Sequence, residues 1–185
     1  MSERKIREWA FPHINKFRIY IDVGASNGDT AFPFINVFQK IIAFEPNPTS
    51  YAELSLNSMI YSYNIALGNV NGETTLNIPI NGSPEWGSVS KDRIATWGEF
   101  TSMMVPIKKL DGFDLEDVDF IKIDVEQGEY DVIMGAMKTL KRCMPVIMFE
   151  NKRNENDEVI RILTELGYSI QKYKSDTIAY WKKQS

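Results

Sequence analysis

Short apolar runs alternate with amphipathic stretches along most of the chain. Five runs have the length and composition of buried strands, and they cover residues 18–24, 40–45, 60–66, 120–125 and 145–149. The stretches between them have the apolar spacing of helices, at residues 29–39, 48–56, 128–142 and 156–166. Strands that alternate with helices predict an α/β fold, in which a mostly parallel sheet is covered by helices on both faces.

This alternation breaks after the third predicted strand. Residues 73–80 and 103–110 have the composition of strands, and the segment between them is rich in Gly, Ser, Pro and Trp. We therefore interpret residues 69–112 as a β-rich insertion. Two further strands, at 168–174 and 177–183, predict a hairpin at one edge of the main sheet.

Length and charge narrow the class of protein. The 185 residues predict a single domain, in which residues 1–17 form a lid or a packing segment ahead of the first strand. The 21 basic and 25 acidic residues are mixed and give a net charge of −4, which disfavours nucleic acid as a partner. The single cysteine, Cys143, and the lack of any apolar run of membrane-spanning length predict a cytoplasmic protein without a membrane partner. Oligomeric state stays open.

A glycine turn follows the first predicted strand, and an acid ends the second. Gly24 and Gly28 allow the backbone to turn tightly and to approach a ligand. Glu45 stands at the carboxyl end of its strand, and parallel strands open onto one crevice at that end. The turn and the acid together predict a nucleoside-like ligand whose ribose hydroxyls bind the carboxylate.

A dinucleotide is the obvious alternative, because its fingerprint also joins a glycine turn to a later acid. That fingerprint has glycine at its first, third and sixth positions, whereas Ser26 and Asp29 occupy the third and the sixth here. Asp22, Asp29 and Glu45 would also surround an anionic pyrophosphate with carboxylates. S-adenosylmethionine fits these residues better, because it combines a ribose with a cationic sulfonium.

Four sequence blocks resemble, in order and spacing, the FkbM-like S-adenosylmethionine-dependent methyltransferases. The blocks are Asp22-Val-Gly-Ala-Ser-Asn-Gly28, Phe44-Glu-Pro-Asn47, Asn64-Ile-Ala-Leu-Gly68 with Asn71-Gly-Glu73, and Phe120-Ile-Lys-Ile-Asp-Val-Glu-Gln-Gly-Glu129. Ser26 stands where the family usually has Asn, and Gln127 stands where Gly commonly follows the Asp-x-Glu pair. The second departure changes the turn expected over the methyl group, and it therefore bears on the choice of acceptor more than on cofactor binding.

The resemblance implies a Rossmann-like class I methyltransferase fold with a seven-stranded sheet and an antiparallel C-terminal strand. It also implies O-methylation of a sugar or another small hydroxylated acceptor, with S-adenosylmethionine as cofactor. The residues that this resemblance places at the cofactor are Asp22, Gly24, Ala25, Ser26, Gly28, Thr30, Glu45, Pro46, Ala66 and Asp124.

The predicted catalytic residues lie at the end of the fourth strand. Strand alternation puts Lys122, Asp124 and Glu126 on one side of that strand. A hydroxyl acceptor benefits from proton removal as its bond to the methyl group forms, so Glu126 or Glu129 is the candidate general base. For Lys122 a buried network with carboxylates is the alternative to a catalytic role.

Three alternatives stay open. Asp124, Glu150 and Asn151 resemble the acid, acid and amide set of catechol-type enzymes, which would bind Mg²⁺ or Ca²⁺ and methylate phenolic hydroxyls; we predict no metal. A nucleoside-binding module without activity is the second, although binding alone would not need the acidic run after strand four. The third concerns aromatic residues that either stack on an acceptor or belong to the core or a lid, namely Tyr61, Tyr63, Trp86, Trp97 and Phe100.

Overall fold

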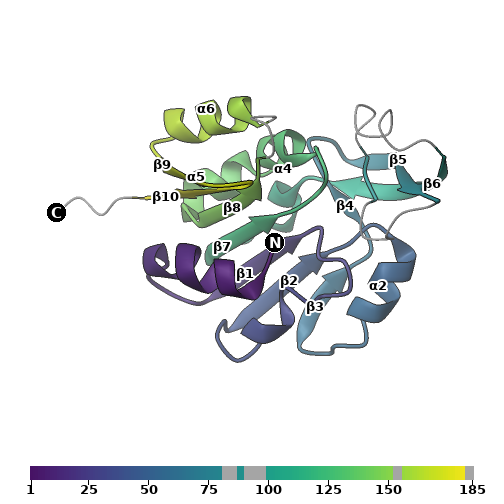
Figure 1. Cartoon of the computed structure of the whole chain (residues 1–185), viewed down its shortest axis with the longest axis horizontal. Helices are drawn as coiled ribbons and strands as arrows, with labels where there is room; N and C mark the ends of the chain where they lie inside the picture. The colour runs from purple at the N-terminus through teal and green to yellow at the C-terminus, as the bar shows by residue number, and fades with distance from the viewer. Residues whose placement is uncertain (81–86, 90–98, 152–155, 182–185) are drawn as a thin grey trace.

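The structure of the chain is a computed structural model, and it describes residues 1–80, 87–89, 99–151 and 156–181. Trp86 and Trp97 lie outside these residues. The main sheet has seven strands in the order β3-β2-β1-β7-β8-β10-β9 (Figure 1). Their bounds are β1 Ile19–Val23, β2 Lys40–Phe44, β3 Ile60–Tyr63, β7 Val118–Ile123, β8 Val146–Glu150, β9 Ser169–Tyr173 and β10 Asp176–Tyr180.

The predicted Rossmann-like fold is confirmed by the pairing of these strands. The pairs β2–β3, β1–β2, β1–β7 and β7–β8 are parallel, whereas β10 is antiparallel to both of its neighbours, β8 and β9. The central strands are buried on both faces, and for this reason they are nearly continuous apolar runs. Asp22 and Lys122 are the buried charged residues within β1 and β7, and the strand register pairs them directly.

Helices pack on both faces of the main sheet (Figure 1). One face is covered by α4 (Glu129–Gly135), α5 (Met137–Cys143) and α6 (Asp157–Glu165). The other face is covered by α2 (Pro48–Leu54), by the segment around η3 (Phe32–Phe34) and by the N-terminal helices. These N-terminal helices are α1 (Glu3–Lys5), η1 (Ile6–Ala10) and η2 (Phe11–His13), and Ile6 and Ala10 are fully buried in the core. No helix among the described residues is long and apolar enough to cross a membrane.

The helix predicted at residues 29–39 is wrong. Turns and the short 3₁₀ helix η3 replace it. Pro33 has no backbone N–H, and its ring restricts the preceding residue, so an α-helix centred on it is disfavoured. Phe34 and Phe38 are nevertheless buried, because the segment packs its aromatic side chains onto the sheet without a regular helix.

The helix predicted at residues 128–142 forms as two short helices, α4 and α5. A Cβ atom on Gly135 would lie 2.0 Å from the carbonyl oxygen of Gly68, so glycine is required where α4 approaches that turn. The helical conformation is interrupted at Ala136. Asp111 then accepts hydrogen bonds from the backbone N–H groups of Lys138 and Thr139, and so caps α5 as a separate helix.

The insertion forms a second sheet of three strands in the order β4-β6-β5. Strand β4 (Ala66–Leu67) precedes β5 (Gly72–Pro79) and β6 (Phe100–Lys108), and the 3₁₀ helix η5 (Leu110–Phe113) leads back to β7. The third strand of the main sheet therefore ends at Tyr63, earlier than predicted, and Ala66 belongs to the second sheet. Figure 1 shows this small sheet beside the main one, with β4 next to α4.

Candidate functional site

Two adjoining cavities open at the carboxyl ends of β1, β2 and β7. The strand order reverses between β1 and β7, and ligands of open α/β sheets bind at such a switch point. One cavity has a mainly apolar lining, and the other has a mainly polar lining. Gly24, Ser26 and Asp124 line both cavities, so these residues mark the place where the two meet.

The glycine turn depends on left-handed backbone conformations. Gly24 has φ +71°, and a Cβ atom there would lie 2.1 Å from the carbonyl oxygen of Asp124. Gly28 has φ +93°, and its Cβ atom would meet the side chain of Leu54 at 2.8 Å. Ser26, with φ +52°, adopts the same region without being glycine. Its hydroxyl oxygen is buried and has no hydrogen-bond partner within the described part of the chain.

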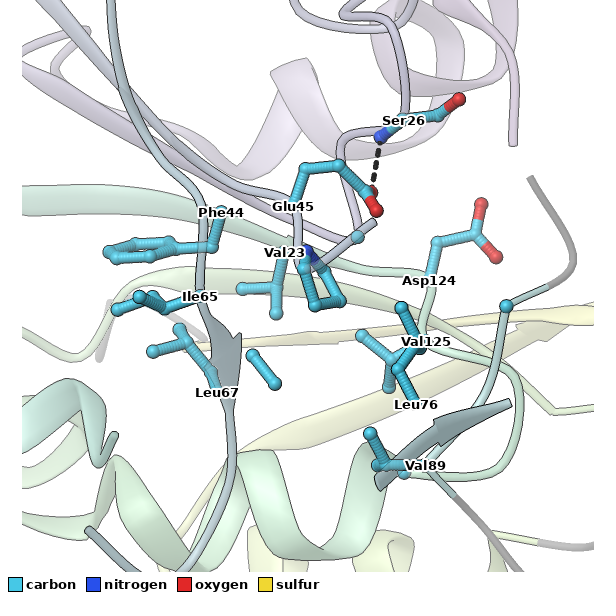
Figure 2. Close-up of a pocket in the computed structure, with 15 residues that line it drawn as sticks. Val23, Ser26, Phe44, Glu45, Ile65, Leu67, Leu76, Val89, Asp124 and Val125 are labelled. Atoms are coloured by element: carbon cyan, nitrogen blue, oxygen red, sulfur yellow. Dashed lines mark hydrogen bonds between the residues drawn. The ribbon is translucent and has the colours of Figure 1, made fainter. Parts of the chain in front are cut away.

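Glu45 closes the turn from the end of β2. Its carboxylate accepts hydrogen bonds from the backbone N–H groups of Ser26 and Asn47, both at 2.8 Å. Figure 2 shows the first of these bonds at the rim of the apolar cavity. Burial raises the pKa of Glu45, and the two backbone hydrogen bonds offset part of that rise. A carboxylate has about four lone-pair positions, so this one retains acceptor capacity for the hydroxyls of a ligand.

Apolar side chains from both sheets wall the first cavity (Figure 2). The main sheet and the adjoining turn contribute Val23, Phe44, Glu45, Pro46 and Val125, and the second sheet with its preceding loop contributes Ile65, Ala66, Leu67 and Leu76. Gly87 and Val89, from the insertion, complete the wall. A flat aromatic ring fits such a lining, with Glu45 at its polar edge.

The second cavity carries charged and polar groups. It is lined by Met1, Gly24, Ala25, Ser26, Asn27, Asp29, Thr30, Lys122, Asp124, Glu126 and Glu150. The α-amino group of Met1 lies 3.1 Å from Oδ2 of Asp124. Asp124 is thus placed to bind an ammonium group at the junction of the two cavities.

Lys122 belongs to the buried network that the sequence suggested as its alternative role. Its ammonium group lies 2.8 Å from Asp22 and donates a hydrogen bond to the carbonyl oxygen of Gly24 at 2.9 Å. Burial alone would lower the pKa of Lys122, but the carboxylates of Asp22 and Asp124 raise it above its ordinary value. Asp22 is fully buried and lines neither cavity. Its ion pair with Lys122 therefore stabilises the glycine turn from the interior of the protein.

Lys122, Asp124 and Glu126 line the same cavity, but strand alternation does not determine the position of Glu126, because β7 ends at Ile123. Glu126 and Gln127 form a turn with φ values of +51° and +74°. This turn, and not the strand, places Glu126 at the polar cavity. Ser88 of the insertion donates a hydrogen bond of 2.6 Å to the Glu126 carbonyl oxygen.

Glu129 lines neither of the two cavities and lies in the first turn of α4. It is 2% exposed, and burial raises its pKa to about 7. Glu126 is therefore better placed than Glu129 to contact a ligand.

The three residues of the alternative metal site do not act together, because two line the polar cavity and the third bonds the start of a helix. Glu150 lines the polar cavity with Asp124, but the carboxamide oxygen of Asn151 accepts a hydrogen bond from the backbone N–H of Asn156 at 3.0 Å. Asn151 is thereby engaged at the start of α6. Among the described residues no group of three or more His, Cys, Asp or Glu side chains is placed to hold a metal ion.

The structure brings most of the predicted cofactor residues together at the two cavities, apart from Asp22 and Gly28. It also adds residues that sequence reasoning missed. Ile65 and Leu67 flank Ala66, which was predicted to contact the cofactor. Their position in the sequence could therefore have indicated them. Leu76, Gly87 and Val89 come from the insertion, whose pairing nothing in the sequence indicates. The exposed aromatic residues Tyr61, Tyr63 and Phe100 line neither cavity.

Comparison with known proteins agrees with this arrangement. A family model described as the methyltransferase FkbM domain matches residues 22–170. The 2-O-methyltransferase NoeI of Sinorhizobium fredii (strain NBRC 101917 / NGR234) is 28% identical over 145 residues, which are 67% of this chain and 59% of NoeI. The chain thus spans less than two thirds of that relative.

Solved structures share the fold. The methyltransferase FkbM from Methylobacillus flagellatus KT superposes with a TM-score of 0.60 at 16% identity, over 89% of this chain and 44% of that one. A protein from Streptococcus mutans in complex with SAH (S-adenosylhomocysteine) gives a TM-score of 0.56 at 10% identity, over 97% of both chains. At these identities the likeness concerns the fold.

Proposed function

This chain belongs to the methyltransferase FkbM domain family, and we propose that it transfers a methyl group from S-adenosylmethionine to a hydroxyl oxygen of a sugar or another small acceptor. The observation that carries the proposal is the junction of an apolar and a polar cavity at Gly24, Ser26 and Asp124. A ligand with an aromatic base at one end and a zwitterion at the other matches that junction.

The apolar cavity suits the adenosine end. Phe44, Ile65 and Val89 offer apolar contact to the adenine ring, and the remaining acceptor capacity of Glu45 faces the ribose diol. Each hydrogen bond from a hydroxyl to this charged group contributes about 1.5–3 kcal/mol. Glu45 is therefore the residue on which discrimination of the ribose depends most.

The polar cavity suits the methionyl end. Asp124 lines both cavities, and its carboxylate can accept hydrogen bonds from the methionyl α-amino group. The buried hydroxyl of Ser26 provides a further polar contact. Lys122 and Asp22 hold the turn that carries Ser26, and so act as positioning residues.

Glu126 supplies the base on the acceptor side. When bound, S-adenosylmethionine supplies a methyl group made electrophilic by its sulfonium. Glu126 lines the polar cavity, where its carboxylate would take the proton of the acceptor hydroxyl. The walls of the cavity align the acceptor, which is the larger part of the task because the methyl group is already activated.

Support for an oxygen acceptor comes from the relative. NoeI is named as a 2-O-methyltransferase, and the family model covers all residues that line the two cavities except Met1. The mixed surface charge of this chain favours a small acceptor over nucleic acid.

The test is transfer of labelled methyl groups from S-adenosylmethionine to a panel of glycans and small hydroxylated compounds. We expect label on oxygen of at least one acceptor, unchanged transfer after treatment with excess EDTA, and much weaker transfer by Glu45→Ala. Label found on nitrogen alone, or no transfer to any member of a broad panel, would contradict the proposal. Activity that EDTA abolishes and Mg²⁺ or Ca²⁺ restores would favour the metal-assisted alternative.

A further inference from the structure

The short segment Gly87–Val89 of the insertion touches both halves of the site. Gly87 and Val89 line the apolar cavity beside Leu76. Ser88, between them, is 1% exposed and donates its hydrogen bond to the carbonyl oxygen of Glu126 on the acceptor side. Figure 2 shows Val89 and Leu76 next to Val125, which immediately precedes that turn.

Ser88 is itself held in place by the second sheet. Its backbone exchanges two hydrogen bonds of 2.9 Å with Asn77 of β5. The side chain of Asn77 in turn accepts a hydrogen bond of 2.7 Å from Ser102 of β6. A continuous chain of contacts therefore runs from the insertion, through Ser88, to the turn that carries Glu126.

The Glu126–Gln127 turn requires stabilising contacts of this kind. Glu126 and Gln127 both have φ in the left-handed region, which is uncommon for residues other than glycine and unfavourable for two in succession. Conformations of this kind persist where surrounding contacts enforce them. The hydroxyl of Ser88 bonds the carbonyl of the first of the two residues, at the point where the chain changes direction.

We propose that Ser88 is a positioning residue that holds the Glu126–Gln127 turn and links it to occupancy of the apolar cavity. A nucleoside packed against Gly87 and Val89 restrains the segment to which Ser88 belongs, and the restrained hydroxyl then restrains the turn. The acid that faces the acceptor is thereby ordered most strongly when the cofactor is bound. The link between cofactor binding and the order of the turn rests on the proposed function.

The test compares Ser88→Thr with Ser88→Val, since the two side chains have the same shape and differ in the hydroxyl. The readout is amide hydrogen exchange around the turn, where Asp124 N–H bonds Val23 and Val132 N–H bonds Gly128. Without ligand, we expect exchange at these amides to stay within about twofold of wild type in Ser88→Thr and to be about fivefold faster in Ser88→Val. Equal exchange in the two variants would overturn the proposal.

Thr75→Val is the matched control, because it makes the same exchange of a hydroxyl for a methyl group on β5, where the Thr75 hydroxyl bonds the sulfur of Met104 and not the turn. It should leave exchange at Asp124 and Val132 unchanged. If the larger side chains prevent folding, as thermal melts will show, Ser88→Ala gives the same comparison with wild type. Faster exchange in Ser88→Ala then supports the proposal, and unchanged exchange refutes it.

A second arm adds S-adenosylhomocysteine. It should slow exchange at the turn in wild type and Ser88→Thr but not in Ser88→Val, while slowing exchange in the glycine turn of all three proteins. Slowing at the Glu126 turn in Ser88→Val equal to that in wild type would refute the link to the cavity. If wild type binds no S-adenosylhomocysteine, the proposed function fails, and the ligand-free comparison still decides whether Ser88 holds the turn.

Discussion

At the residue scale, the proposed chemistry depends on the carboxylate of Glu126. Glu126→Gln keeps the shape of the side chain and removes the base, so turnover should fall by a factor of roughly 100 to 10,000. Affinity for S-adenosylhomocysteine should stay within about twofold. Glu150→Gln, which removes the same charge from the same cavity, should cost less than about tenfold. Single-turnover rates and calorimetry measure both effects, and wild-type turnover in Glu126→Gln would show that the base is elsewhere.

The buried acid Glu129 makes stability depend on pH. Burial raises its pKa from an ordinary 4.5 to about 7 in the folded protein. The unfolded chain then loses this proton at lower pH than the folded protein, so the contribution is fully present below pH 4.5 and disappears as pH rises through 7. Its upper bound is about 3 kcal/mol. The unfolding free energy of Glu129→Gln should lack this decline, as urea titrations at several pH values will show. Parallel curves for the two proteins would contradict the assignment.

Residue identity alone indicated part of the site. Glu45 and the glycine turn could be predicted from the sequence, because glycines after one parallel strand and an acid at the end of the next are typical of a nucleoside-binding crevice. Strand alternation placed Glu126 beside Lys122 and Asp124, and all three line the polar cavity, but it could not reveal the turn that begins after Ile123. The depth at which Glu129 is buried depends on the packing of α4, which no local pattern encodes.

At the scale of elements, the close approach of α4 to the second sheet depends on Gly135, just before the break between α4 and α5. Gly135→Ala would place a Cβ atom 2.0 Å from the Gly68 carbonyl oxygen, so the helix must move away from the second sheet. We expect a loss of about 1–3 kcal/mol in unfolding free energy, measured by urea denaturation. Gly112→Ala is the control, because a Cβ atom there meets nothing within 4 Å, and it should change stability by less than about 0.5 kcal/mol. Equal effects of the two substitutions would show that the steric contact is not the cause.

The elements differ in how far their sequences determine them. Strands buried on both faces leave apolar runs that are easily recognised, and all five strands predicted from such runs exist. The segment at 29–39 has the apolar content of a helix, but the backbone restriction at Pro33 prevails over that pattern. The split of residues 128–142 lies beside a close approach of Gly135 to Gly68, which is far away in the sequence, and periodicity cannot reveal such a contact.

At the scale of the whole molecule, two sheets together make one site. The main sheet supplies the crevice at its switch point, and the insertion supplies a wall of the apolar cavity and the bond to the Glu126 turn. The family pattern predicted the first of these. The second follows from long-range pairing within the insertion, which depends on how β5 and β6 pack and not on any local signal.

The most direct test of the central claim is calorimetric titration with S-adenosylhomocysteine. We predict binding to a single site in wild type, affinity lower by about 10- to 100-fold in Glu45→Ala because hydrogen bonds to the ribose are lost, and no binding of NAD. Glu53→Ala removes an exposed acid from the neighbouring helix α2 and should leave the affinity unchanged. Equal affinity of wild type and Glu45→Ala, or binding of NAD in place of S-adenosylhomocysteine, would contradict the assignment of this crevice.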